Sequence, residues 1–256
     1  MSSTHFLEVA DAPAVAHAAL RLLVPAAQKA IDAKGSFSVA LSGGSTPKLL
    51  YEMLARGEPT NPRWPFDWNK VHIFFGDERC VPRDHADSNF RMAHEALLSK
   101  VPIPPENIHR MRGEIQPNAA AIEYGQMLKD QFGEGGLDLV LLGMGDDGHT
   151  ASLFPHTEAL KETKHRCVAH FVEHSTTGKS WRITLTAPFI NRAAEVLILI
   201  AGASKAARLQ EVWHGPKDPD RLPIQLIQPL GKLLWIIDKA AGGHGKAAAG
   251  GASRIA

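Results

Sequence analysis

The chain has little cysteine, no excess of charge of either sign and no long apolar run. Its 256 residues include two cysteines, too few for a disulfide scaffold and suited to a reducing compartment. The 28 basic and 27 acidic residues nearly cancel, so nothing in the composition supports a nucleic-acid or membrane-surface partner. No apolar stretch approaches the roughly 18 residues of a membrane span, and no signal-peptide pattern opens the sequence. We therefore expect a soluble, cytoplasmic protein without a membrane partner.

What the chain does have is a regular alternation of short apolar runs with helical patterns. The apolar runs that we read as strands include residues 36–41, 71–75, 137–142, 196–201 and 233–237. Strands that alternate with helices predict an α/β fold whose mostly parallel sheet is covered by helices on both faces. We assign residues 1–239 to a single domain. Residues 240–256, mostly glycine and alanine, have little to bury, and we expect them to form a flexible tail.

The most informative stretch is LDLVLLGMGDDGHTASLFP at residues 137–155. An apolar strand leads into a glycine-rich loop that carries Asp146, Asp147 and His149, which is how α/β proteins present chemistry at the carboxyl end of a sheet. Residues 143–148 (GMGDDG) also fit the dinucleotide-binding pattern G-x-G-x-x-G. However, two acids inside the loop would repel the pyrophosphate that this pattern serves. We interpret His149 as the centre of a reaction and the dinucleotide match as coincidental.

Two further loops are suited to binding an anion. At residues 42–47 (SGGSTP), Gly43 and Gly44 allow close backbone approach, and Ser45 or Thr46 can cap the helix that follows. Residues 202–205 (GASK) place Lys205 at the start of another helix. Free N–H groups and the positive end of the helix dipole favour phosphate at both places. For the first loop, an ordinary strand-to-helix turn is an equally good interpretation.

A third cluster, Asp77, Glu78 and Arg79, follows the strand at residues 71–75. Charges at one strand end are usually solvated loop residues, but charged clusters at two strand ends favour a shared site. Cys80 follows Arg79, and a buried, unreactive thiol is the favoured interpretation for it.

Together these motifs carry a resemblance. Residues 42–47 (SGGSTP), 76–79 (GDER), 143–155 and 202–206 (GASKA), in this order, resemble the glucosamine-6-phosphate isomerase/6-phosphogluconolactonase family, and within it the lactonases. The resemblance implies a modified Rossmann-like sheet and hydrolysis of 6-phospho-D-glucono-1,5-lactone to 6-phosphogluconate without a metal or cofactor. It also implies that His149 is the general base and Arg79 an active-site arginine. The phosphate side would comprise Ser42, Gly43, Gly44, Ser45, Thr46, Arg182 and Lys205.

The chemistry is compatible with these residues. A lactone is an activated ester, so a neutral histidine that deprotonates water is sufficient. Either Asp147 or Asp77 could orient the imidazole, and the sequence does not decide between them. Arg79 or the N–H groups of the glycine loop could stabilise the oxyanion. The sequence is compatible with a monomer or a homodimer.

Three alternatives compete with this interpretation. The amino-sugar isomerases of the same family carry a glutamate where this chain has Phe154, and usually a tyrosine where it has Arg79; both differences favour the lactonase. A catalytically silent sugar-phosphate sensor would need only the phosphate loops. A metal site of Asp146, Asp147 and His149 is disfavoured because adjacent acids tend to point in different directions.

Overall fold

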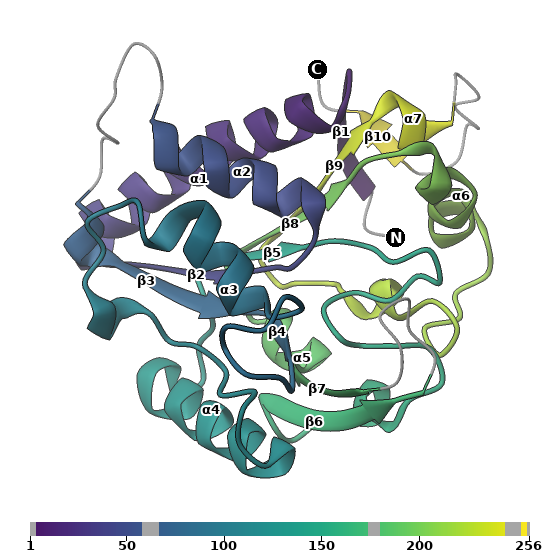
Figure 1. The fold of residues 1–256 in the computed structure, drawn as a ribbon. Helices are drawn as coiled ribbons and strands as arrows, with labels where there is room; N and C mark the ends of the chain where they lie inside the picture. Colours follow the sequence, from purple (N-terminus) through teal and green to yellow (C-terminus); the bar gives the residue numbers. More distant parts are fainter. Residues whose placement is uncertain (1–3, 58–66, 174–179, 244–251, 255–256) are drawn as a thin grey trace.

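The computed structural model describes residues 4–57, 67–173, 180–243 and 252–254, and its centre is a seven-stranded parallel sheet. In order across the sheet, the strands are β10 (Ala252–Arg254), β1 (Thr4–Val9), β9 (Lys232–Asp238), β8 (Glu195–Ile200), β5 (Leu139–Leu142), β2 (Phe37–Leu41) and β3 (Val71–Phe75) (Figure 1).

Strand β5 shows why this sheet is covered on both faces. All four of its residues are buried. Leu139 and Leu141 pack into the apolar cluster on one side of the sheet, whereas Val140 and Leu142 pack into the cluster on the other side. Because successive side chains of a strand point in opposite directions, an uninterrupted apolar run produces a strand that needs a layer on each face.

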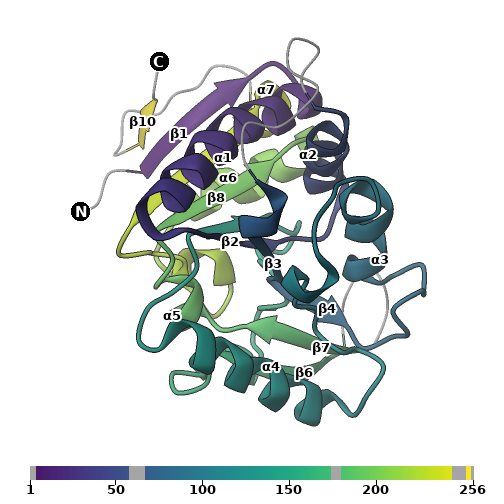
Figure 2. The same ribbon diagram turned by 90° about the vertical axis from the view of Figure 1, so that its left-hand side faces the viewer.

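One face is covered by α1 (Ala12–Lys34), α2 (Ser45–Arg56) and α3 (Asn89–Ala93), which continues into a π-helical turn at His94–Leu98. Figures 1 and 2 show α1 and α2 side by side over this face. The Asp11 side chain caps α1 by accepting from the N–H of Ala14 at 2.9 Å, and Gly35 ends the helix with φ of 84°. Both boundaries are the ones that their residue types favour.

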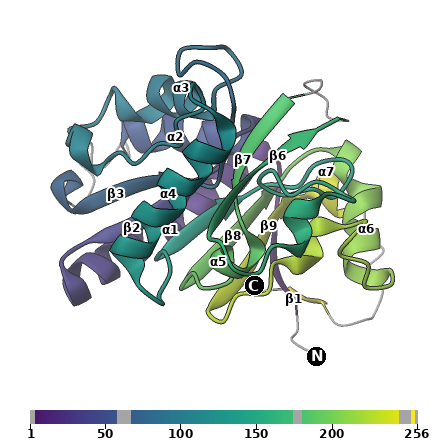
Figure 3. The same ribbon diagram turned by 90° about the horizontal axis from the view of Figure 1, so that it is seen from below.

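The other face carries α4 (Pro117–Phe132), α5 (Ala187–Ile190), α6 (Ala206–His214) and a second, antiparallel sheet. That sheet has the order β4 (Asp77–Arg79), β7 (Ser180–Leu185) and β6 (Cys167–Val172). Figure 3 views the protein from this side, with α4, β6 and β7 in front of the main sheet. The shorter helices of the described chain are the 3-10 turns Trp68–Lys70, Pro105–Asn107, Glu158–Lys161, Ala203–Lys205 and Pro223–Leu226, and α7 (Lys239–Gly242).

Four adjacent strands, β8, β5, β2 and β3, bring the sequence motifs together. They run parallel, so their carboxyl ends lie at one edge of the sheet. The loops that leave this edge begin at Ala201, Gly143, Ser42 and Gly76. In open α/β sheets this edge is where ligands bind.

The predicted fold class is confirmed: the sheet is mostly parallel and has helices on both faces. Two details differ from expectation. Residues 77–79, expected to lie in a loop, form strand β4 because they pair with β7. Within the expected tail, α7 starts at Lys239 and β10 pairs with β1, while residues 244–251 and 255–256 lie outside the described residues. Across the described ranges no helix is long and apolar enough to span a membrane.

Candidate active site

A cleft of about 290 Å³ opens at the carboxyl edge of the sheet. Its walls come from the four loops that the motifs occupy, and it is lined by residues 42–47, Asp77, Arg79, Asn89, residues 143–146, 149–151 and 199–201, and Lys205. The structure thus brings together His149, Arg79, Asp77, Lys205 and the 42–47 loop, which are far apart in the sequence.

His149 and Asp147 form a hydrogen-bonded pair at this cleft. The Nδ1 atom of His149 lies 2.6 Å from Oδ1 of Asp147, and the same oxygen accepts from the His149 N–H at 3.0 Å. Because a carboxylate only accepts, the neutral ring must carry its proton on Nδ1, which leaves Nε2 as the basic nitrogen. Of the two aspartates considered, Asp147 is therefore the one hydrogen-bonded to the imidazole.

The electrostatics of the pair are consistent with an ionised Asp147. Burial raises its pKa, but the hydrogen bond from the His149 side chain and the charge of that ring lower it, and the net pKa lies below the ordinary value of an aspartate. The carboxylate is thus prepared to stabilise an imidazolium.

The loop geometry explains why glycines surround the pair. A Cβ at position 145 would lie 2.1 Å from Nδ1 of His149, so only glycine leaves room for the ring. Gly148, between the two partners, has φ of 87°, which favours glycine. Phe154 then stacks on the imidazole with ring centroids 4.1 Å apart.

This geometry also argues against dinucleotide binding at the G-x-G-x-x-G pattern of residues 143–148. After β5 the chain enters turns, and the next helical segment is the short 3-10 turn Glu158–Lys161. The helix N-terminus that would hold a pyrophosphate does not follow the glycine loop.

Asp77, the other aspartate considered for orienting His149, has different partners. It is 7% exposed, accepts from the Ser152 hydroxyl at 2.6 Å, and accepts from the Asn89 amide at 3.1 Å. It borders the cleft, but these contacts hold the surrounding loops together.

Arg79 also lines the cleft, and its neighbour Glu78 holds the chain around it. The Arg79 guanidinium donates to the carbonyl of Asp87 at 2.5 Å. The buried Glu78 carboxylate accepts from the N–H groups of Arg79, Asn89 and Phe90 at 2.7–2.8 Å. Burial raises the pKa of Glu78, against the effect of these three donors. Glu78 thereby fixes the start of α3, on which Asn89 lies.

The loop at residues 42–47 has the features of an anion site. Gly44, with φ of 103°, takes the N-cap position of α2, so the expected cap by Ser45 or Thr46 is wrong: no side chain caps the helix. The first-turn N–H groups therefore remain available to a ligand at the positive end of a 12-residue helix. A Cβ on Gly43 would lie 2.2 Å from the Asn89 side chain, so this position requires glycine.

Tyr51 fixes the start of this loop. Its buried hydroxyl accepts from the Ser42 N–H and donates to the Ser42 carbonyl, both at 2.8 Å. Burial raises the pKa of Tyr51, so the hydroxyl keeps its proton.

Lys205 also lines the cleft, and its Nζ atom is 2.6 Å from Oδ1 of Asp146. The two adjacent acids of the loop thus have separate partners, Lys205 for Asp146 and His149 for Asp147. In the described part of the chain no group of three His, Cys, Asp or Glu side chains is arranged to hold a metal ion.

Arg182 is not among the residues that line the cleft. It lies in β7, opposite Arg79 of β4, and is 3% exposed. Burial lowers its pKa, and the nearby charge of Arg79 lowers it further. Its assignment to the phosphate side stays a prediction, because Arg182 is not among the cleft-lining residues.

Several residues of the site were not identified from the sequence. Asn89 lines the cleft and Tyr51 holds the 42–47 loop, yet neither stands out in a glycine- or charge-based pattern. Ser88, just before Asn89, caps α3 by accepting from the N–H of Arg91 at 3.1 Å. As for Cys80, burial raises its pKa to about 11, which fits an unreactive thiol.

Comparisons with known proteins agree with the motif resemblance. The family described as glucosamine-6-phosphate isomerases/6-phosphogluconolactonase matches residues 10–235. A 6-phosphogluconolactonase from Nostoc sp. is 44% identical over 241 residues, covering 91% of this chain and 94% of its own.

Solved structures extend the comparison. A 6-phosphogluconolactonase from Trypanosoma cruzi superposes with a TM-score of 0.80 at 29% identity, covering 95% of this chain and 98% of that one. A monomeric glucosamine-6-phosphate deaminase also reaches 0.80, over 93% and 99% of the chains, but at 19% identity, so it shares only the fold. The chain belongs to the glucosamine-6-phosphate isomerase/6-phosphogluconolactonase family.

Proposed function

We propose that this protein hydrolyses 6-phospho-D-glucono-1,5-lactone to 6-phosphogluconate, the second step of the oxidative pentose phosphate pathway. The observation that carries the proposal is the His149–Asp147 pair, 2.6 Å apart, in the same cleft as an uncapped helix N-terminus and Lys205. The similarity to 6-phosphogluconolactonases over more than nine-tenths of the chain supports the same reaction.

His149 acts as the general base in this mechanism. Its Nε2 atom takes a proton from water as the water oxygen bonds to C1 of the lactone, and Asp147 stabilises the resulting imidazolium. The C1–ring oxygen bond then breaks, and the proton on Nε2 passes to the departing ring oxygen. The products are a C1 carboxyl group and a C5 hydroxyl, and no external oxidant or reductant is needed.

Arg79 is the proposed partner of the developing oxyanion. It lines the same cleft as His149 and carries a permanent charge, so it can stabilise negative charge on the carbonyl oxygen as water attacks. Asp77 is assigned to the architecture around it, because its carboxylate is already engaged by Ser152 and Asn89.

The substrate phosphate is assigned to the α2 end of the cleft. The N–H groups that follow Gly44 and the Lys205 ammonium lie on walls of one cavity, and both favour a dianion. We also propose that the enzyme works in the cytoplasm, as a monomer or homodimer, without a metal or cofactor.

Phe154 argues against the rival chemistry of the family. Isomerisation of an amino sugar needs an additional acid or base to open the ring and move a proton between C1 and C2. A phenyl ring provides neither, and here it is stacked on His149. A sugar-phosphate sensor would have no need of a histidine oriented by a carboxylate.

The direct test is a coupled-dehydrogenase assay on freshly generated 6-phosphogluconolactone, corrected for spontaneous hydrolysis, run beside an assay for ammonia release from glucosamine 6-phosphate. We expect acceleration of lactone hydrolysis and no ammonia. Ammonia release without lactone hydrolysis would assign the isomerase chemistry instead. The absence of both activities would favour the sensor.

A further inference from the structure

Arg208 of α6 reaches from outside the cleft to the backbone of the catalytic loop. Its Nε atom donates to the carbonyl oxygen of Asp146 at 2.9 Å. That carbonyl belongs to the peptide that joins Asp146 to Asp147, so the contact fixes the peptide plane that immediately precedes the carboxylate partner of His149. Arg208 is not among the residues that line the cleft.

The stem of the same side chain packs on the next part of the loop. A Cβ on Gly148 would lie 3.6 Å from Cδ of Arg208 and 2.9 Å from Cδ2 of Leu222. The Gly148 carbonyl in turn accepts from the N–H of Ile224 at 3.1 Å. Residues 146–148 are therefore held between α6 and the segment at 222–224.

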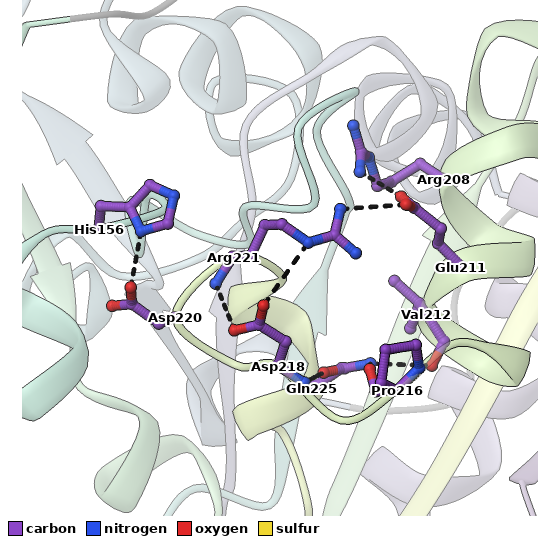
Figure 4. Close-up of polar contacts among 9 residues, drawn as sticks. All are labelled: His156, Arg208, Glu211, Val212, Pro216, Asp218, Asp220, Arg221 and Gln225. Carbon is purple, nitrogen blue, oxygen red and sulfur yellow. Dashed lines mark hydrogen bonds and ion pairs between the residues drawn. The ribbon is translucent and has the colours of Figure 1, made fainter.

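Arg208 is itself held in place by a chain of charged side chains. Its Nη1 atom pairs with Glu211, and Nη1 of Arg221 lies 3.0 Å from the other oxygen of Glu211. Arg221 is close to Asp218, with Nε 3.6 Å from Oδ2. Figure 4 shows this series, with Glu211 between the two arginines. Such a network limits the rotamers of Arg208 more than an isolated exposed pair could.

The beginning of α6 contacts the same loop residue through a second group. Lys205, three residues before Arg208, pairs with the side chain of Asp146, while Arg208 binds its carbonyl. Residues three apart in a helix lie on the same face. One face of this helical segment therefore fixes Asp146 at two points.

We propose that Arg208, supported by Glu211 and Arg221, is a positioning residue for the His149–Asp147 pair. The Asp147 carboxylate accepts from the backbone N–H and the ring of His149, two residues further along the same loop, so its place depends on the backbone at residues 146–148. By holding that backbone, Arg208 keeps Oδ1 of Asp147 within 2.6 Å of Nδ1 of His149. The inference rests on the proposed hydrolysis for its kinetic consequence but not for its structural one.

The test compares Arg208→Met, which keeps the packing stem but loses the donor, with Arg192→Met as a matched control. Arg192 forms an exposed ion pair with Glu134, at 3.1 Å, outside the cleft. We expect Arg208→Met to lose about 10- to 100-fold in kcat, with a smaller change in KM, because small displacements of a catalytic group cost that much. The control should retain kcat. Added guanidinium ion should restore part of the lost rate to Arg208→Ala.

A second readout does not depend on turnover. The proton on Nδ1 of His149, hydrogen-bonded to Asp147, should give a low-field proton NMR resonance that is absent in His149→Ala. We expect this resonance to shift or broaden in Arg208→Met and to stay unchanged in Arg192→Met. Glu211→Gln, which keeps Arg208 but removes its anchor, should change both readouts in the same direction and by less.

Unchanged kcat and an unchanged resonance in Arg208→Met would overturn the proposal, whatever the effect on thermal stability. If that variant does not fold, unchanged readouts in Glu211→Gln would overturn it. An unmodified protein that fails to hydrolyse the lactone contradicts the proposed function instead, and the resonance still shows whether Arg208 positions the pair.

Discussion

Lys205 and Asp146 form an ion pair at the wall of the cleft, with Nζ 2.6 Å from Oδ1. The pair is only partly shielded, since the two side chains are 22% and 60% exposed. If Lys205 binds the substrate phosphate, Asp146 is a competitor for it, and its negative charge opposes the incoming dianion.

We predict that Asp146→Asn lowers KM for 6-phosphogluconolactone a few-fold, whereas Lys205→Met raises it by about 10- to 100-fold. The second figure corresponds to the loss of a charge-assisted hydrogen bond of roughly 1.5–3 kcal/mol. Asparagine leaves the backbone contact with Arg208 available. The measurement is KM for the phosphorylated lactone beside KM for unphosphorylated gluconolactone. Equal changes for both substrates would show that the phosphate does not bind at this end of the cleft.

Tyr51→Phe should weaken both the fold and phosphate binding. The substitution leaves the N–H and the carbonyl of Ser42 without the Tyr51 hydroxyl, and each unsatisfied buried group costs about 1–3 kcal/mol. Urea unfolding and KM would be measured together.

Tyr124→Phe is the matched control, because the buried Tyr124 hydroxyl accepts from the N–H of Phe75 at 2.9 Å and so holds the end of β3 instead of the 42–47 loop. It should lower stability with little change in KM. Similar KM changes in both variants would show that Tyr51 does not act on the loop specifically.

His72, in the edge strand β3, and its neighbour His109 should make the stability of the fold sensitive to acid. Nδ1 of His72 lies 3.3 Å from Nε2 of His109, and burial together with His72 lowers the pKa of His109 to about 4. An unfolded histidine titrates near 6.5, so between about pH 6.5 and 4 the unfolded chain binds more protons. The stabilising effect of neutral His109 is therefore complete above that window and is lost as the pH falls through it.

We predict that His109→Phe loses less stability than the unmodified protein when the pH falls from 7 to 5. Phenylalanine retains the stacking of His109 on Phe74, whose centroid lies 4.5 Å away, and removes the titrating group. His17→Gln, at an exposed position of α1, is the control. An identical pH dependence of the urea midpoint in all three proteins would refute this account.

Asp147→Asn should reduce kcat far more than it reduces stability. The amide keeps the shape of the side chain but cannot stabilise an imidazolium, and its NH₂ group favours the wrong tautomer of His149. By analogy with other carboxylate–histidine pairs, the loss should reach several orders of magnitude. Asp77→Asn is less informative, because Asp77 is buried and engaged by Ser152 and Asn89. Turnover near the starting level in Asp147→Asn would mean that orientation of His149 does not depend on this carboxylate.

Local sequence signals were sufficient for most of the fold. The apolar run at β5, the cap at Asp11 and the stop at Gly35 depend on neighbouring residues alone, and β5 lies within the expected run at 137–142. Strand β4 of the antiparallel sheet was missed because Asp77, Glu78 and Arg79 do not look like a strand. Their conformation depends on pairing with β7, about 100 residues away, and on donors from α3 to Glu78.

The same limit applies to the site. The ordered motifs identified the loops that form the cleft, but the choice between Asp147 and Asp77 depends on the turn at Gly148, and the burial of Arg182 depends on β4–β7 pairing. Tyr51, Asn89 and Arg208 act through tertiary contacts that no local sequence pattern predicts.

The measurement that tests the central claim most directly is the turnover of 6-phosphogluconolactone by His149→Ala beside His165→Ala. His165 is a matched control, because its Nδ1 atom also pairs with a carboxylate, Glu162 at 3.0 Å, but it does not line the cleft. We predict that His149→Ala remains folded and loses about 10²- to 10⁴-fold in rate, the usual contribution of a positioned general base, while His165→Ala keeps its activity. A folded His149→Ala variant with a rate close to that of the control would contradict the account.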